Sequence, residues 1–199
     1  MITFRFDPDA VARAEAAGWR AYYDRDWLRL ARLIVALNEA QFRIPFPASW
    51  LAAGDIVRAS IAWAPANHDL DAVRAHLERY YERARRHSGL RFDPARAAAL
   101  EVAYWDVHRR LVGRPDKTEF VETLTALHAL LFDLPPGAAR LSAEWRVAAN
   151  TTVDGITGRA SADPERDWLR LEGQLQNCYR AIAAALAGRT APVPVPEVV

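Results

Sequence analysis

The chain contains a single cysteine, Cys178, among its 199 residues. One cysteine excludes an intrachain disulfide framework, and it also excludes a metal cluster held by several thiolates. Proteins without disulfides are typical of reducing compartments. We therefore expect this protein to be cytoplasmic.

Long apolar runs and targeting signals are also missing. The apolar stretch at 27–37 is interrupted by Arg29 and Arg32, and it falls short of the roughly 20 residues that cross a bilayer as a helix. The segment 1–8 has neither the basic flank nor the apolar run of a secretory signal. We expect no transmembrane helix and no export.

The chain has no strong excess of charge of either sign. It carries 26 basic and 25 acidic residues, a formal net charge of +1. Such a balance gives no long-range field toward nucleic acid or an anionic membrane, so we predict neither as a partner. With 51% hydrophobic and 26% charged residues, the composition is that of a globular domain.

Alanine, leucine and arginine dominate the sequence, and all three favour helices. No segment shows the alternating pattern of a strand. Prolines, glycines and capping residues divide the chain into helical blocks, at 10–17, 19–42, 48–64, 70–87, 94–112, 118–132, 138–156 and 164–186, with Gly18 as a candidate break or bend between the first two. We predict an all-α, single-domain bundle of six to seven helices with short connections.

The predicted bundle domain covers residues 1–188, and a proline-rich tail follows at 189–199. In the tail, Pro192, Pro194 and Pro196 alternate with other residues. This pattern favours an extended polyproline conformation, so we predict a flexible, disordered tail. A segment of this kind is also a candidate recognition element for a partner protein.

Polar side chains on apolar helix faces are the informative feature, because the chain has no recognised motif. In block 19–42, Asn38 and Gln41 fall within the apolar arc at about 100° per residue, whereas Glu39 faces outward. An unsatisfied buried amide costs about 1–3 kcal/mol. Asn38 and Gln41 therefore need hydrogen-bond partners inside the fold.

Block 94–112 carries two ionisable residues on its apolar face. Glu101 and His108 lie seven residues apart on one stripe, with Tyr104 and Trp105 between them. We predict that both point into the bundle and share a pocket. A buried carboxylate should then be neutral, paired or bound to a metal.

His128 occupies a similar apolar position in block 118–132. Glu101, His108 and His128, with Glu172 as a weaker fourth, have the side-chain types that bundle-core metal sites use. The chain has no Glu-x-x-His pair, which argues against a ferritin-like site, and no Cys-x-x-Cys-His or His-Glu-x-x-His motif. A mononuclear metal site or a histidine-ligated haem stays open.

Two other interpretations compete with a metal site. The first is a satisfied interior network, in which His108 bonds to Glu101 or a tyrosine and His128 bonds to a backbone carbonyl or water. The second is a ligand pocket with mostly apolar walls and a few polar groups. Its candidate lining residues are Glu101, His108, His128, Tyr104, Trp105, Asn38 and Gln41, together with Trp50 and Trp63.

We predict a small-ligand- or protein-binding module with a partly polar interior pocket. Its seven tryptophans and high apolar share suggest association into a homo-oligomer through an aromatic-rich face. The alternative is a metal- or haem-dependent enzyme that uses Glu101, His108 and His128 as ligands or as general acid and base. The sequence identifies no substrate, cofactor or reaction.

Overall fold

The structure is a computed structural model that describes residues 4–188. These residues form eight α-helices and no strand. The helices are α1 (Pro8–Tyr23), α2 (Trp27–Phe42), α3 (Ala48–Trp63), α4 (Leu70–Ser88), α5 (Pro94–Leu111), α6 (Thr118–Phe132), α7 (Pro136–Thr157) and α8 (Pro164–Gly188). The prediction of an all-α bundle is confirmed. The predicted proline-rich tail, residues 189–199, lies outside the described residues.

Aspartates begin several of the helices. Asp93 precedes Pro94, and its carboxylate accepts from the backbone N–H groups of Ala95 and Arg96 at 2.9 and 3.1 Å. Asp7 and Asp69 cap α1 and α4 in the same way. Each cap satisfies N–H groups that have no partner within the helix. The starts of α4 and α5 agree with the predicted blocks at 70 and 94, whereas α1 begins at Pro8, two residues before the predicted block.

The first two helices divide at a different place from the one predicted. The candidate break at Gly18 is wrong, because α1 continues through Gly18 to Tyr23. A single glycine costs a helix about 1 kcal/mol, which does not end it when neighbouring turns pack well. The chain turns instead at Arg25, whose φ is 60°, and Asp26 caps α2 by accepting from the N–H of Arg29 at 3.1 Å. The described residues form eight helices, which equals the number of blocks in the sequence and exceeds the six or seven helices predicted.

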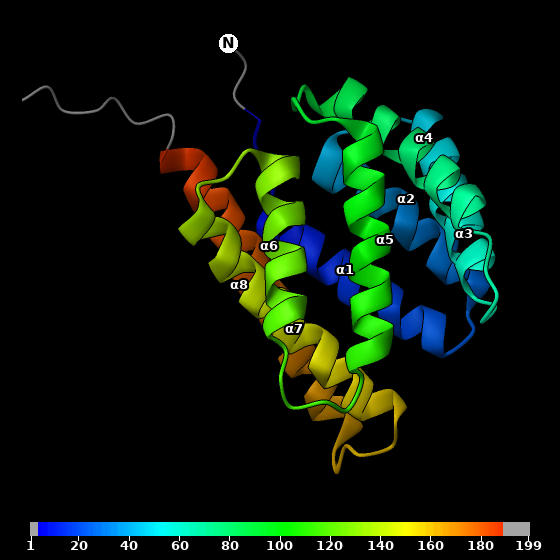
Figure 1. Ribbon diagram of the computed structural model, residues 1–199, viewed down its shortest axis with the longest axis vertical. Coiled ribbons are helices and arrows are strands. Elements are labelled where there is room, and N and C mark those ends of the chain that lie inside the picture. Colours follow the sequence, from blue (N-terminus) through cyan, green and yellow to red (C-terminus); the bar gives the residue numbers. More distant parts are fainter. Residues whose placement is uncertain (1–3, 189–199) are drawn as a thin grey trace, which may run out of the picture.

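The helices form a closed circuit. Each one packs against the next along the chain, and α8 returns to pack against α1. Figure 1 shows α5 and α6 side by side in the foreground, with α1 crossing behind them. The buried apolar residues form one core cluster that draws on all eight described helices. Because the circuit closes on itself, the middle of the bundle is enclosed by side chains from every helix.

None of the described helices combines the length and apolar character needed to cross a lipid bilayer.

Candidate functional site

A cavity of about 760 Å³ lies inside the circuit of helices. All eight described helices contribute to its wall, and most of that wall is apolar. The aliphatic side chains come mainly from α2, α3 and α6, and they include Leu30, Ile34, Leu37, Ile56, Val57, Leu124 and Leu127. Aromatic rings and a small set of polar groups complete the lining.

The cavity reaches the surface at one side. Three of its lining residues are large apolar side chains with high exposure: Tyr22 at 49%, Trp27 at 58% and Ile61 at 67%. They stand near the end of α1, at the start of α2 and near the end of α3. The mouth of the cavity is therefore rimmed by these three helix ends.

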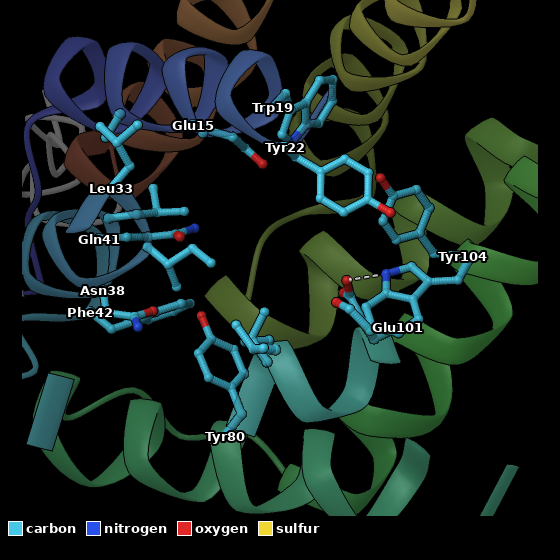
Figure 2. Close-up of a pocket in the computed structure, with 18 of the residues that line it drawn as sticks. Glu15, Trp19, Tyr22, Leu33, Asn38, Gln41, Phe42, Tyr80, Glu101 and Tyr104 are labelled. Atoms are coloured by element: carbon cyan, nitrogen blue, oxygen red, sulfur yellow. Dashed lines mark hydrogen bonds between the residues drawn. The ribbon is translucent and has the colours of Figure 1, made fainter. Parts of the chain in front are cut away.

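Glu101 of α5 is the most unusual polar group in the wall. One of its carboxylate oxygens accepts from the Tyr81 hydroxyl at 2.8 Å, and the other accepts from the indole N–H of Trp105 at 2.9 Å. Figure 2 shows the bond to the indole as a dashed line. Burial raises the pKa of Glu101, although both hydrogen bonds and the Arg146 charge act in the opposite direction.

A buried ion pair forms a second polar region of the wall. Arg146 donates from Nη1 to Oε2 of Glu15 at 2.6 Å, and the Tyr179 hydroxyl donates to the same oxygen at 2.5 Å. The guanidinium also stacks over the ring of Trp19, with Cζ 5.0 Å from the ring centroid. The charge of Arg146 is thus balanced by Glu15, and its flat face is covered by an aromatic ring.

His128 of α6 stays neutral in the folded protein. Burial, with a smaller effect of the Arg146 charge, lowers the pKa of His128 to about 3. Its Nδ1 lies 2.8 Å from the hydroxyl of Ser142, and that hydroxyl donates to the Ala139 carbonyl at 2.8 Å. Because the only hydroxyl proton of Ser142 points to the carbonyl, Nδ1 of His128 is the donor.

Amide side chains occupy the wall opposite Glu101. Figure 2 places Asn38, Gln41 and Phe42 on one side of the cavity, and Glu101, Tyr22 and Tyr104 on the other. Asn38 is buried and donates to the Ser49 carbonyl at 3.4 Å. The cavity therefore has an amide-bearing side and an acidic, aromatic side.

Six of the seven residues proposed from the sequence as pocket candidates line this one cavity. They are Asn38, Gln41, Glu101, Tyr104, Trp105 and His128. The seventh, His108, lies outside the lining; its Nε2 is 3.0 Å from Asp154 Oδ1, and its ring stacks on Phe120. Seven residues advance a helix by about 10 Å. Glu101 and His108 therefore share a stripe but not a site.

The metal-ligating group that was considered as the alternative does not form among the described residues. In the part of the chain that the structure describes, no three His, Cys, Asp or Glu side chains are placed to hold a metal ion. Glu101 is bonded to Tyr81 and Trp105, whereas His108 and His128 contact Asp154 and Ser142. Because their partners differ, Glu101, His108 and His128 do not meet at one site, contrary to the prediction. Glu172 accepts from Gln176 on its own helix at 3.3 Å.

The two tryptophans expected in the pocket lie elsewhere. Trp50 is 48% exposed, and neither Trp50 nor Trp63 belongs to the cavity lining. Trp63 packs against Trp105 with ring centroids 5.9 Å apart, and Arg109 stacks over its ring. Trp63 thus lies behind the cavity wall rather than in it.

Sequence reasoning missed the ion pair in the cavity wall. Glu15 follows Val11 by four residues and Ala12 by three on the buried stripe of α1. Arg146 lies three residues after Ala143 on the buried stripe of α7. The signal for both residues is the same as for Glu101, a charged side chain on the apolar stripe of a helix.

Compared with known proteins, the chain matches no family model, no curated protein and no solved structure.

Proposed function

We propose that this protein binds a small, mostly apolar molecule in its central cavity. The observation that carries this proposal is the cavity itself, about 760 Å³ with a mainly apolar wall. Small-molecule sites in proteins typically measure about 300–1,000 Å³ and combine apolar walls with a few fixed polar groups. Both the size and the lining of this cavity fall within that description.

The energetics of packing support the same proposal. Protein interiors are packed about as densely as organic crystals, and each unfilled volume inside them costs stability. A large apolar space in the centre of a single domain is therefore costly unless something occupies it. A small molecule that fills the cavity recovers the lost contacts with the wall.

The polar groups of the wall are held in place before any ligand arrives. Tyr104 donates to the side-chain oxygen of Asn150 at 3.2 Å, and Asn38 is fixed by the Ser49 carbonyl. Preorganised polar groups orient a ligand without paying an ordering cost on binding. The exposed rim of Tyr22, Trp27 and Ile61 gives an apolar ligand a route from solvent.

A fluorescent apolar probe tests the proposal. We expect N-phenyl-1-naphthylamine to bind one saturable site and gain fluorescence in the apolar interior. The blocking variant is Gly18→Phe, since Gly18 lines the cavity and a side chain built there meets nothing within 4 Å. The matched control is Gly173→Phe, another helical glycine with nothing within 4 Å but outside the cavity lining.

We expect Gly18→Phe to lose probe binding and Gly173→Phe to keep it, while circular dichroism shows both variants folded. If Gly18→Phe does not fold, the series Gly18→Ala and Gly18→Val gives the same answer as a graded loss of affinity. Equal binding by the blocking and control variants contradicts the proposal, as does the absence of saturable binding by the unaltered protein.

A further inference from the structure

The charges in the cavity wall do not balance. Among the described residues that line the cavity, two are acidic, Glu15 and Glu101, and one is a guanidinium, Arg146. His128 adds no charge, because its pKa is lowered to about 3. Arg146 is engaged by Glu15 at 2.6 Å in a pair that is largely buried. An ionised Glu101 therefore leaves the cavity with one negative charge in excess.

The direct partners of Glu101 are neutral. It accepts from the hydroxyl of Tyr81 and the indole N–H of Trp105. A carboxylate in an apolar interior is strongly disfavoured unless an opposite charge reaches it. A cation entering the cavity would supply that charge.

Aromatic rings line the same cavity as Glu101. Trp19, Tyr22, Tyr80, Tyr104 and Trp105 all contribute to the lining. In Figure 2 the rings of Tyr22 and Tyr104 stand on the same side of the cavity as the carboxylate of Glu101. Ring faces attract organic cations within about 6 Å, and they do so more strongly when water is excluded.

Building on the proposed function, we infer that the ligand is a hydrophobic amine or quaternary ammonium compound, whose cationic group lies against Glu101 among these rings. The apolar body of the molecule would extend toward the aliphatic side chains of α2 and α6. Glu101 then pairs with a ligand charge in the same way as Glu15 pairs with Arg146.

The inference has a pH signature. The titratable and charged groups that line the cavity together with Glu101 are Glu15 from α1, Tyr22 from α1, Tyr80 and Tyr81 from α4, Tyr104 from α5, His128 from α6, Arg146 from α7 and Tyr179 from α8. Burial favours the protonated form of Glu101, whereas a bound cation favours the ionised form. Cation binding therefore releases the proton, and its affinity increases as the pH rises.

Three probes of nearly equal shape separate the effect of charge from that of size. They are 2-(1-naphthyl)ethylamine, which is an ammonium ion, 2-(1-naphthyl)ethanol, which is neutral, and 1-naphthaleneacetate, which is a carboxylate. Each competes with N-phenyl-1-naphthylamine for the unaltered protein at pH 5 and pH 8. At pH 8 we expect the ammonium compound to compete about tenfold better than the alcohol. We expect the carboxylate to compete worst, and the advantage of the ammonium compound to shrink at pH 5.

Two charge-removing variants locate the effect. Glu101→Gln should reduce the affinity for the ammonium compound about tenfold and change that for the alcohol little. The control, Glu122→Gln, removes the same charge from an exposed position on α6 outside the cavity, and it should retain the preference. The pH series on the unaltered protein decides the matter even if Glu101→Gln does not fold.

The outcomes separate this inference from the proposed function. If the fluorescent probe binds but the alcohol or the carboxylate competes as well as the ammonium compound at pH 8, the cationic-ligand inference is overturned and the binding cavity stands. If the fluorescent probe finds no saturable site, both fail together.

Discussion

Arg146 of α7 and Glu15 of α1 form an ion pair 2.6 Å apart, although they lie 131 positions apart in the chain. The two side chains are only 13% and 8% exposed. The pair bridges α1 and α7, two helices that both pack against α8. The pair therefore forms part of the cavity wall and connects the first helix directly to the seventh.

Removing Arg146 should destabilise the fold strongly. Arg146→Met leaves Glu15 buried without its cation, which costs about 3–5 kcal/mol. The matched control is Arg140→Met on the same helix, which breaks an exposed pair with Glu144 and should cost less than about 1 kcal/mol. Urea unfolding of both variants gives the comparison, and equal losses would show that the buried pair has no special role.

Replacing Gly18 with alanine should stabilise the protein. Gly18 lies inside α1 in helical conformation, and a Cβ there meets nothing within 4 Å. Alanine restricts the unfolded chain more than glycine does, so we expect a gain of about 0.5–1 kcal/mol.

Gly89 provides the control of opposite sign. Its φ of 74° ends α4 in a left-handed conformation that alanine adopts at a cost. Gly89→Ala should therefore lower the melting temperature while Gly18→Ala raises it. A lower melting temperature for Gly18→Ala would mean that α1 does not run through this residue as described.

The helical repeat in the sequence identified much of the cavity wall. A stripe of apolar residues defines which side of a helix faces the interior, so Asn38, Glu101 and His128 were recognised as polar exceptions. The repeat carries no information on which helices meet. Glu15 pairs with Arg146, and Tyr104 pairs with Asn150, because of the way the helices are arranged around the bundle. That arrangement depends on tertiary packing.

The error over His108 has the same origin. A helical wheel projects all residues onto one circle and discards their position along the axis. Glu101 and His108 coincide on the wheel, yet only Glu101 lies level with the cavity. The contact of Glu101 with Tyr81 and Trp105 could not be predicted in full from the sequence, because the bond to Tyr81 depends on how α4 packs against α5.

Self-association through an aromatic-rich face stays a prediction. Trp27, Leu28, Trp50, Leu51 and Ile61 are all at least 48% exposed, and they lie on the neighbouring helices α2 and α3. Light scattering should show a mass that increases with protein concentration. Leu28→Glu should reduce it, whereas Leu169→Glu, a change at a residue equally exposed but on α8, should not. A monomer at high micromolar concentration contradicts the prediction.

Glu101→Gln should alter the pH dependence of stability. The pKa of Glu101 is raised in the folded state by burial, so the folded chain holds this proton more tightly than the unfolded chain does. Its contribution is then favourable below the unfolded pKa and is lost as the pH rises through the folded pKa. The stability of Glu101→Gln relative to the unaltered protein should therefore increase between pH 4 and pH 8.

Urea unfolding across this pH range measures the effect without any ligand. Glu122→Gln, on an exposed position, should show no comparable trend. A relative stability of Glu101→Gln that falls with rising pH would mean that the hydrogen bonds of Tyr81 and Trp105 outweigh the burial of the carboxylate.

His128 should make the protein sensitive to acid. The folded pKa is lowered from the ordinary 6.5 to about 3 by burial, so the unfolded chain takes up a proton that the folded chain refuses. The stability contributed by the neutral ring is present above pH 6.5 and is lost as the pH falls toward 3, on the order of 4 kcal/mol at pH 3.

In His128→Asn, an amide N–H replaces the imidazole donor to Ser142. This variant should be less stable at pH 7 because it loses ring contacts, yet its stability should fall less steeply in acid. His87→Asn, at the half-exposed end of α4, should keep the full acid dependence. If the unfolding midpoints of His128→Asn and the unaltered protein fall in parallel from pH 7 to pH 3.5, protonation of His128 is not the cause of the acid sensitivity.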